Sequence, residues 1–548
     1  MDAFGALAIG PRQIHTIETW VCYLWACCDA QAVIGPPPAR AGKAFASRAI
    51  DLGAGGKKPM AVKGSWNRAA GARVVFAAAA GCGFAAPAYA DWDQTAKLTA
   101  DDPAAGDVFG FSVGISGTIA IVGAPQDDDA GSSAGSAYVF DTTTGAQIAK
   151  LTAPDAAAND RFGESVGVSG TIAIVGAHED DDAGSNSGSA YLFDTTTGSQ
   201  LFKLTANDAA AGDEFGFSVG ISGATAIVGA HADGAGFNSG SAYLFDTITG
   251  AQIAKLTAND AAVNDWFGES VGISGTTAIV GARFDDDAGF SSGSAYLFDT
   301  TTGAQIAKLT ASDAAAGDWF GYSVGISGTT AIVGAHADDD AGSASGSAYL
   351  FDTTTGAQIA KLTANDAAAR DNFGFSVGIS GTIAIVGAHA DDDAGYSSGS
   401  VYLFDTTTGN QIAKLTASDA AAHDRFGWSV GISGTTAVVG AYADDDGGGN
   451  SGSAYVYKFV LPGDADGNGS VDLFDFHILA ANFGASTGNL GEDGDFNGDG
   501  VVDLIDFDTL AQNFGSTSPA VVPAPASLSL LGLASPLLLR GRARRRRS

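Results

Sequence analysis

The pattern FGxSVGISGTxAIVGA occurs seven times in this chain, with small variations, and constrains the fold more than any other feature. The copies begin at Phe109, Phe162, Phe215, Phe267, Phe320, Phe373 and Phe426. Successive copies therefore lie 52 or 53 residues apart. A fixed period of this size predicts a repeat architecture, in which each repeat forms one unit that packs on its neighbours.

Each repeat contains four short segments with strand character, which are rich in Val, Ile, Tyr, Phe and Thr and are separated by Gly, Ser, Asp and Thr. In the fifth copy they are Phe320 to Ser327, Thr329 to Ala335, Gly346 to Asp352 and Ala357 to Ala364. The repeat leaves no room for a helix. A four-stranded antiparallel sheet with two apolar faces is not stable alone, so the pattern predicts the stacked blades of a β-propeller.

The two ends of the repeat array predict how it closes. The seventh copy ends after its third strand segment, Gly452 to Phe459, whereas the segment before the first copy, Asp91 to Ala100, resembles the fourth strand of the other repeats. An N-terminal strand that completes the last blade would close the ring and leave no exposed edge. We therefore predict a mainly β fold, with a seven-bladed propeller over residues 91–459. The alternative is an open solenoid.

The residues that open the first strand and end the second carry a family resemblance. Phe109-Gly110 and Gly123-Ala124-Pro125 resemble the FG-GAP repeats of integrin α-chain propellers and their bacterial relatives. The resemblance covers about residues 92–459 and implies the propeller fold, whose activity would lie in its loops. Integrin-type repeats carry a calcium loop between these two strands, but here the connection is as short as Ser327-Gly328-Thr329. That particular calcium site is therefore not expected.

The chain is strongly acidic, with a formal net charge of −34 at pH 7. Residues 91–539 contain 12 Lys and Arg against 57 Asp and Glu, because most basic residues lie at the two ends. Such a body repels nucleic acid and anionic membranes and suits an extracellular, cation-rich setting. The cysteines all precede residue 91, so the mature protein would contain no disulfide, and calcium is the expected stabilising ion. They are Cys22, Cys27, Cys28 and Cys82.

Residues 60–90 have the three parts of a secretory signal peptide. Basic residues between Met60 and Arg73 precede a short apolar segment, and Ala88-Tyr89-Ala90 fits the small-x-small rule for cleavage. The apolar segment is too short for a membrane span. Residues 1–59 show no clear pattern. We expect them to be a disordered leader that results from a start assigned upstream of the true one at Met60.

Acidic residues gather in two connections of each repeat, one after the second strand and one after the fourth. In an up-and-down sheet both connections emerge at the same end, so we expect them on one face of the disc. One interpretation is a set of calcium sites, since Ca²⁺ takes about six to eight oxygen ligands. The other is a solvated acidic rim that keeps the protein soluble. The third repeat has only Asp233 at this point. The candidate calcium ligands are Asp127, Asp129, Asp180, Asp182, Asp285, Asp287, Asp338, Asp340, Asp391, Asp393, Asp444 and Asp446.

Four of the seven histidines occupy one equivalent position, just before the first of these acidic connections. They are His178, His231, His336 and His389, and the other repeats have Pro125, Arg283 and Tyr442 there. A histidine beside carboxylates can ligate a transition metal or act as a general base. A position that accepts four residue types favours a structural role instead. Because no single repeat holds a unique group of His, Tyr and carboxylate residues, we predict no catalytic residue and no enzymatic activity.

Two loops near the C-terminus have the spacing of EF-hand calcium loops. Side-chain oxygens occupy positions one, three, five, nine and twelve, glycine occupies position six, and the carbonyl of position seven would complete each site. A short amphipathic helix is predicted after each loop, Leu473 to Gly484 and Leu504 to Gly515. The predicted ligands are Asp464, Asp466, Asn468, Ser470, Asp472 and Asp475 in the first loop, and Asp495, Asn497, Asp499, Val501, Asp503 and Asp506 in the second.

The duplicated loop and helix, with Asp rather than Glu at position twelve, resembles a type I dockerin over residues 463–516. The resemblance implies bound calcium and a cohesin partner of the kind found in cellulosome-like assemblies. Such dockerins often carry polar recognition residues at positions ten and eleven, where this chain has Leu473-Phe474 and Leu504-Ile505. The alternative is a calcium-stabilised domain that only spaces or packs on the propeller. Because so small a domain has little core, we expect calcium binding to contribute to its folding.

Residues 517–548 contain the segment Val522-Pro523-Ala524-Pro525, an apolar run from Leu528 to Leu539 and then six arginines. This tail resembles a PEP-CTERM sorting signal with Ala524 in place of the usual Glu, which implies an exosortase-type processing enzyme. The alternative is a plain membrane anchor, for which the apolar run is short.

Together these features predict a non-enzymatic, secreted or cell-surface calcium-binding protein. We expect a monomer that mediates adhesion, or binds an extracellular protein or polysaccharide, through its propeller loops. The alternative is a component of an extracellular polysaccharide-degrading assembly that binds carbohydrate and is recruited through the dockerin-like module.

Overall fold

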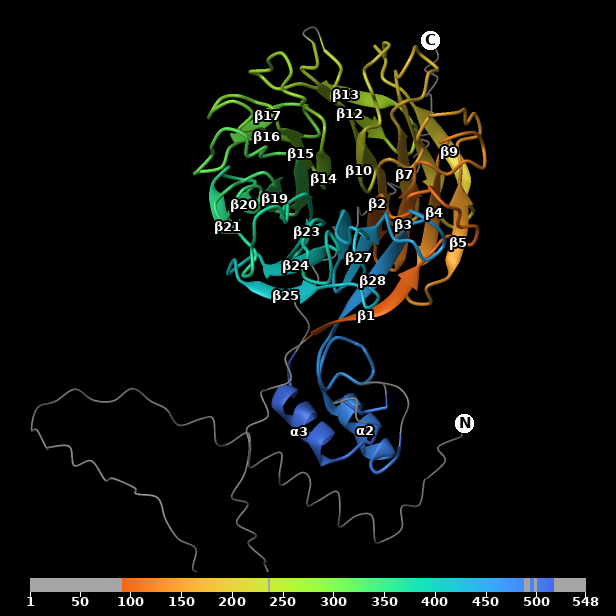
Figure 1. Cartoon of the computed structure of the whole chain (residues 1–548), viewed down its shortest axis with the longest axis vertical. Coiled ribbons are helices and arrows are strands. Elements are labelled where there is room, and N and C mark those ends of the chain that lie inside the picture. Colours follow the sequence, from red (N-terminus) through yellow and green to blue (C-terminus); the bar gives the residue numbers. More distant parts are fainter. Residues whose placement is uncertain (1–90, 235–236, 487–492, 497–499, 517–548) are drawn as a thin grey trace, which may run out of the picture.

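Strands dominate the computed structural model, which describes residues 91–234, 237–486, 493–496 and 500–516. Its 28 strands form seven antiparallel sheets of four strands, arranged as blades around a central axis (Figure 1). The predicted seven-bladed propeller is confirmed. The predicted leader (1–59), signal peptide (60–90) and sorting signal (517–548) lie outside the described residues.

Each blade contributes one strand to each of four concentric positions. The innermost strands are β2 (Ser112–Ser116), β6 (Val166–Ser169), β10 (Ser218–Ser222), β14 (Val271–Ser274), β18 (Ser323–Ser327), β22 (Ser376–Ser380) and β26 (Ser429–Ser433). The second strands are β3 (Ile119–Ala124), β7 (Ile172–Ala177), β11 (Thr225–Ala230), β15 (Thr277–Ala282), β19 (Thr330–Ala335), β23 (Ile383–Ala388) and β27 (Thr436–Ala441). The third strands are β4 (Ser136–Asp141), β8 (Ser189–Asp194), β12 (Ser241–Asp246), β16 (Ser294–Asp299), β20 (Ser347–Asp352), β24 (Ser400–Asp405) and β28 (Ser453–Val460). The outermost strands are β5 (Gln147–Leu151), β9 (Ser199–Leu204), β13 (Gln252–Leu256), β17 (Gln305–Leu309), β21 (Gln358–Leu362), β25 (Gln411–Leu415) and β1 (Asp91–Leu98).

The N-terminal strand closes the ring. β1 pairs antiparallel with β28, with Trp92 opposite Phe459 and Leu98 opposite Ala454, so the last sheet has the order β1-β28-β27-β26. The last blade therefore takes one strand from the start of the array and three from its end. This confirms the closure predicted from the spare strand and the missing strand, and it excludes the open solenoid.

The core lies between the blades, where the faces of neighbouring sheets meet. The second and third strands are buried almost throughout. The phenylalanine of each Phe-Gly pair is buried with them, and Phe162 packs edge-on against Tyr191 and Phe193 at ring-centroid distances of 5.5 and 5.8 Å. Ile121 and Val139 of the preceding repeat belong to the same apolar cluster. Each core thus needs two neighbouring repeats, which is why one repeat cannot be stable alone.

The Phe-Gly pairs lie before the innermost strands and not inside them. In the fifth repeat the strand expected to begin at Phe320 begins at Ser323, and the other three strands differ from expectation by one or two residues. The reason is that Phe320 bridges to Gly293 of the preceding blade, and Gly321 then turns with a φ of 92°. A Cβ at Gly321 would lie 2.2 Å from the carbonyl oxygen of Ser294. Only glycine permits this close approach of the two blades.

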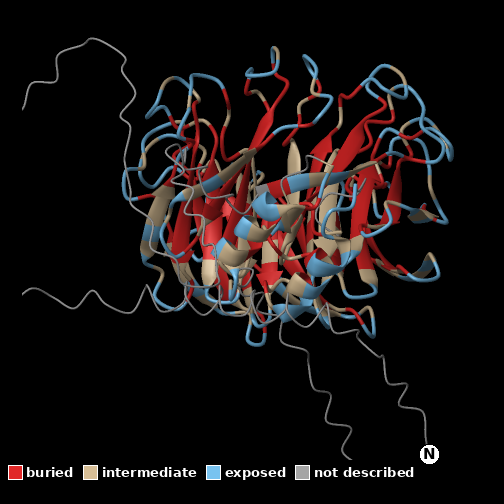
Figure 2. Cartoon of the chain, turned by 90° about the horizontal axis from the view of Figure 1, so that it is seen from below, coloured by how far each residue is buried: buried red, intermediate tan, exposed pale blue. Residues whose placement is uncertain are grey.

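The two faces of the disc differ in their loops (Figure 2). The connections after the second and fourth strands of each blade are long, and they emerge at the same end of the strands. Their side chains meet there, because Asp155 follows β5, Asp180 follows β7, and their carboxylates lie within 4.8 Å of each other. This confirms that both acidic sets share one face, called the acidic face below. The opposite face carries the short SGT and DTTTG turns.

Two short helices follow the propeller, α2 (Leu473–Asn482) and α3 (Leu504–Asn513). Both end two residues before the glycine expected to end them, because the phenylalanine after each helix adopts an extended backbone. Within the described residues, no helix has the length and apolar character needed to cross a membrane. A small core of its own supports this module, and it consists of Leu461, Val471, Leu479, Val502 and Leu510.

Candidate metal centres and the acidic face

The first EF-hand-like loop brings three of its predicted ligands together. Carboxylate oxygens of Asp464, Asp466 and Asp475 lie within 4.8 Å of one another, close enough to share one cation. Asp475 is fully buried in the first turn of α2 and accepts hydrogen bonds from the backbone N–H groups of Ala465 at 2.8 Å and Asp472 at 2.7 Å. Burial raises the pKa of Asp464, and the charges of the other two carboxylates act in the same direction. The loop therefore surrounds a place suited to positive charge.

The remaining predicted ligands of this loop lie in the same turn. The backbone N–H of Asn468 donates to Asp464 at 3.1 Å, and the side-chain oxygen of Asn468 accepts from the N–H of Ser470 at 2.8 Å. Asp472 is the N-cap of α2, and it forms a capping box with Asp475. Loop and helix are thus joined through the carboxylates that would hold the ion.

The second loop repeats this arrangement. Asp506 is fully buried and accepts hydrogen bonds from the backbone N–H groups of Phe496 and Asp503, each at 2.8 Å. Asp495 is also buried and accepts from the N–H of Gly500 at 2.8 Å. Asp503 caps α3 as Asp472 caps α2. Two further predicted ligands, Asn497 and Asp499, lie outside the described residues.

The donor set of these loops fits calcium. The described ligands are carboxylate and amide oxygens, and the backbone of Val501, the predicted carbonyl ligand of the second loop, bridges to Ser486, four residues after the end of α2. Residues 463–516 contain no lysine or arginine, so no such side chain of this module can neutralise the carboxylates. Calcium prefers oxygen ligands of this kind, and a bound ion would supply the missing charge.

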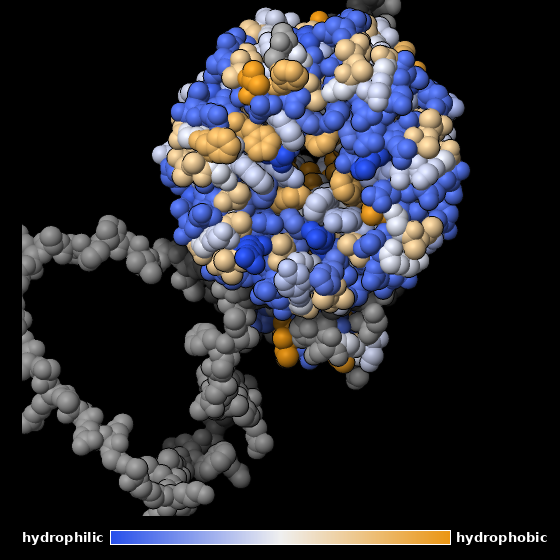
Figure 3. Space-filling view, turned by 45° about the horizontal axis from the view of Figure 1, so that its top comes forward, coloured by the Kyte–Doolittle hydropathy of each residue, from blue (hydrophilic) through white to orange (hydrophobic). Residues whose placement is uncertain are grey.

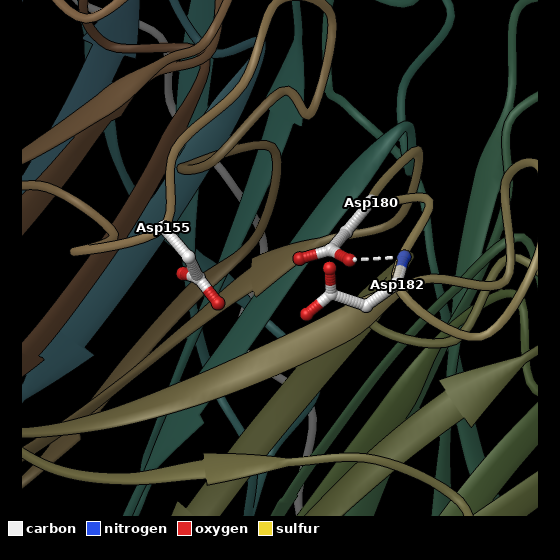
Figure 4. Close-up of side chains that lie close together, drawn as sticks. All are labelled: Asp155, Asp180 and Asp182. Atoms are coloured by element: carbon white, nitrogen blue, oxygen red, sulfur yellow. Dashed lines mark hydrogen bonds between the residues drawn. The ribbon is translucent and has the colours of Figure 1, made fainter.

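Each blade holds a second kind of carboxylate cluster on the acidic face, and here the protein provides the cation. Figure 4 shows Asp180 and Asp182 after β7, and Asp155 reaching toward them from the connection that follows β5. The Nζ of Lys203 on β9 lies 2.7 Å from Asp155 and 2.9 Å from Asp180, and it also contacts Asp182. The hydroxyl of Tyr191 donates to Asp180 at 2.7 Å. A lysine ammonium thus occupies the point where three carboxylates converge.

The arrangement recurs around the disc and includes all twelve carboxylates that were predicted as calcium ligands of the propeller. In the third repeat, Lys255 pairs with only two carboxylates among the described residues, so the predicted gap is present. The seven lysines are Lys97, Lys150, Lys203, Lys255, Lys308, Lys361 and Lys414. In each cluster one carboxylate comes from the connection after a fourth strand, and these are Asp419, Asp102, Asp155, Asp208, Asp260, Asp313 and Asp366, in the same order.

These lysines change how the acidic face is interpreted. Burial alone would raise the pKa of Asp285, but hydrogen bonds from Lys308 and Tyr296 outweigh it and hold that pKa below its ordinary value. Asp285 therefore stays ionised, and its partner is Lys308. Calcium at these carboxylates stays a prediction, because the ion would have to displace an ammonium group from the same oxygens.

The histidines of the acidic face lie among aromatic rings. His336 contacts the rings of Trp319, Tyr322 and Phe375 at centroid distances of 5.3, 4.2 and 5.3 Å. Burial lowers the pKa of His336 to about 3, so its ring is uncharged at neutral pH. Of the described carboxylate groups that could share an ion, none includes a histidine. The geometry favours the structural interpretation of these residues.

Comparison with protein families identifies the repeat. The FG-GAP repeat matches the chain seven times, over residues 92–140, 146–193, 199–245, 251–298, 304–351, 357–404 and 410–457. The chain belongs to the FG-GAP repeat family. Each matched unit runs from the outermost strand of one blade through the three inner strands of the next, so FG-GAP repeats and blades are offset by one strand. This offset is what places β1 in the last blade.

A dockerin type I domain matches residues 462–515, which contain both EF-hand-like loops. Type I dockerins bind calcium and imply a cohesin partner. Together with the FG-GAP repeats, this domain indicates a protein of the cell exterior or the cell surface. A search of curated proteins gave no match to the chain.

Replacing Lys203 with methionine should destabilise the FG-GAP propeller and create a calcium site. The variant leaves Asp155, Asp180 and Asp182 without their ammonium group, and Asp180 is almost fully buried. We expect a loss of roughly 2 kcal/mol in calcium-free buffer, because a buried carboxylate loses its partner. Added calcium should recover most of this loss. Chemical denaturation with and without calcium measures both effects.

The matched control is Lys255→Met, in the repeat that has two described carboxylates at this point. It should be destabilised as well, but calcium should recover much less, because fewer oxygen ligands remain. If calcium stabilises the two variants equally, or stabilises neither of them, the carboxylate clusters do not bind calcium when the lysine is removed.

Proposed function

We propose that this protein is a non-enzymatic binding protein of the cell exterior. Its FG-GAP propeller binds an extracellular protein or glycan, and its dockerin domain attaches it to a cohesin-bearing partner. The observation that carries this proposal is that the propeller clusters contain their own positive charge, whereas the dockerin domain does not. In each propeller cluster a lysine offsets part of the negative charge, whereas residues 463–516 contain no lysine or arginine. Calcium then governs attachment, and the propeller keeps its binding face without calcium.

The acidic face has the features of a ligand surface. Phe237, Phe290 and Tyr396 occupy one equivalent position in the long loops after the second strands, and they are 86%, 77% and 69% exposed. The other repeats have serine or glycine there. Exposed aromatic residues on loops held by a rigid scaffold are typical contact residues of binding surfaces. Figure 3 shows hydrophobic residues on this side of the disc and on the wall of its central hollow.

A non-enzymatic role is supported by the repetition of the same charged groups from blade to blade. A catalytic site needs a group of residues in complementary roles at one place. The carboxylate clusters instead recur with the same lysine and tyrosine partners in successive blades, and the histidines beside them are buried among rings. The charged groups of the acidic face are therefore engaged in holding the blades together.

The second candidate function is a component of a polysaccharide-degrading assembly, and the dockerin helices favour it. Each helix begins with an exposed apolar pair, Leu473 and Phe474 on α2 and Leu504 and Ile505 on α3, with exposures of 57% to 68%. Exposed apolar pairs at equivalent places are suited to a protein partner. In that role the propeller would hold carbohydrate beside the enzymes of the assembly. Export through residues 60–90, and sorting through residues 517–548 by an exosortase-type enzyme, would serve either function.

The test uses the protein of residues 91–516 on surfaces coated with cellulose, xylan or collagen, and a type I cohesin module in solution. We expect EDTA to abolish cohesin binding and to leave binding to the coated surface unchanged. Replacing Phe237, Phe290 and Tyr396 by serine should weaken surface binding by about tenfold or more.

The matched control replaces Ile306, Ile359 and Ile412 by serine. These exposed residues lie on the outermost strands β17, β21 and β25, away from the acidic face. Their loss should leave binding unchanged. The proposal is wrong if EDTA removes surface binding together with cohesin binding, or if both triple variants bind like the unmodified protein.

A further inference from the structure

A cavity of about 190 Å³ lies at the hub of the propeller, where the innermost strands begin on the acidic face. Apart from Ser270, its wall comes from one position of the repeat, the residue x of FGxSV. In five blades this residue is aromatic, and in two it is glutamate, Glu164 and Glu269. The aromatic residues are Phe111, Phe217, Tyr322, Phe375 and Trp428. Figure 3 shows the hollow at the centre of the disc.

The residue x varies between blades, although the residues on either side of it do not. The Phe-Gly before it and the Ser-Val after it are the same in all seven copies. The residue between them faces the cavity and differs from blade to blade. A ring of seven equal blades would give the hub sevenfold symmetry, and the two glutamates remove that symmetry. The hub is thus suited to hold one ligand in one orientation.

The glutamates bring unpartnered polar atoms to the hub. Glu269 is more than nine-tenths buried, and its Oε1 forms an ion pair with Arg283 at 2.9 Å. Its Oε2 has no hydrogen-bond partner among the described residues, and the same is true of Oε2 of Glu164, which lies 3.7 Å from Arg161. A buried polar atom without a partner destabilises the folded protein. A ligand that donates hydrogen bonds to these oxygens would offset that destabilisation.

The surroundings of Glu269 hold it in place for such a role. Arg283 is enclosed by aromatic rings, with its guanidinium 4.8 Å from the ring centre of Trp266, 4.5 Å from that of Phe284 and 5.0 Å from that of Tyr322. The ion pair is therefore fixed from both sides. A polar group supported in this way is preorganised for binding.

We propose that the hub cavity binds one neutral sugar residue at the end of a glycan. Aromatic walls fit the apolar C–H faces of a sugar ring, and the two free carboxylate oxygens fit its hydroxyl groups. The charge of the site fits an uncharged ligand, because Glu269 is already paired with arginine. Burial also raises the pKa of both glutamates, that of Glu164 to about 7 and that of Glu269 to about 8, which lowers the negative charge of the site at neutral pH. The volume admits a single ring.

The sugar enters from the acidic face. Beyond the hub cavity, the channel is lined by the glycine and the isoleucine or valine of each innermost strand, such as Gly114 and Ile115. This apolar wall offers no side-chain hydrogen-bond partner to a hydroxyl group. The inference rests on the proposed function, since it names the ligand class of the same face.

The experiment uses the protein of residues 91–516 and a panel of methyl glycosides of glucose, galactose, mannose, xylose and N-acetylglucosamine at millimolar concentration. Saturation-transfer NMR measures binding, and tryptophan fluorescence gives a second reading. We expect one glycoside to bind. The double variant Glu164→Gln with Glu269→Gln should weaken its binding by about tenfold or more, because the two amide groups cannot replace both Oε2 atoms as hydrogen-bond acceptors. Trp428→Phe should keep the fold and remove the fluorescence change.

The control is Phe290→Ser on the outer loop, which should bind the glycoside unchanged. The inference is overturned if no glycoside binds, or if the double glutamine variant binds like the unmodified protein while its unfolding midpoint shows that it is folded. Neither result decides the proposed function, which is judged by the EDTA and triple-variant experiments on coated surfaces. The two failures are therefore distinguishable.

Discussion

Chelation of calcium is expected to unfold the dockerin domain and to leave the propeller folded. Each EF-hand-like loop holds a buried aspartate, Asp475 or Asp506, that ties the loop to its helix. Without an ion Asp475 faces the carboxylates of Asp464 and Asp466, and the module has only a small apolar core. At a calcium concentration about 100 times Kd, each site adds roughly 2.7 kcal/mol of stability. For a domain of this size, two such sites amount to most of its stability.

The double variant Asp475→Asn with Asp506→Asn should reproduce the effect of EDTA at any calcium concentration. Far-ultraviolet circular dichroism would show the loss of α2 and α3, and native mass spectrometry would show the loss of both ions. The control is Asp508→Asn, an exposed residue of α3 that lies outside the loop. A helical signal that survives in EDTA would show that the module folds without calcium.

Removal of β1 is expected to have the largest effect on the propeller. Without residues 91–98, the last blade loses its outermost strand and exposes the edge of β28. It also loses Trp92 and Leu98 from two interblade cores, and Lys97 from the cluster of Asp419, Asp444 and Asp446. The two apolar side chains alone contribute roughly 5 kcal/mol. We expect the shortened protein to aggregate or to unfold at a much lower denaturant concentration.

The peptide of residues 91–100, added in excess, should restore part of the lost stability by filling the vacant edge. A peptide in which Trp92 and Leu98 are replaced by serine is the matched control and should have no effect. Denaturant midpoints with each peptide provide the measurement. A shortened protein that is as stable as the full propeller would mean that closure by β1 contributes little.

The architecture could be predicted because it depends on the period and on local patterns. Strand segments of fixed spacing, turn residues between them and an unpaired strand at each end leave few alternatives to a closed ring. The register within each blade follows from the same segments. The strand that was expected to begin at Phe320 shows the limit, because that residue bridges to Gly293 of the preceding blade, and such a contact is not visible within one repeat.

The cluster lysines could not be recognised from the sequence in the same way. Lys203 lies on an outermost strand, where a charged residue is expected to face solvent, and its partners Asp155, Asp180 and Asp182 lie 48, 23 and 21 residues away. The fold of one blade brings Lys203 to Asp180 and Asp182, and the stacking of blades adds Asp155. The recurrence of a lysine in the KLT segment of every repeat was the available signal. The dockerin loops needed no such information, because all their ligands belong to one short segment.

The hub was missed for a related reason. The residue x of FGxSV is variable, so it carries no motif of its own, and its seven copies are spread over more than 300 residues of the chain. Ring closure alone gathers Glu164, Glu269 and Trp428 around one cavity. The available signal was that this residue varies while the Phe-Gly before it and the Ser-Val after it do not.

The most direct test of this account is the number of calcium ions that native mass spectrometry finds on the protein of residues 91–516 and on the protein that ends at Phe459, both in micromolar calcium. We predict two ions on the longer protein and none on the shorter, because lysines already occupy the carboxylate clusters of the propeller. Several ions on the shorter protein would contradict the account, since calcium would then displace the lysines. A longer protein without ions would contradict it equally, since the dockerin domain would then fold and act without calcium.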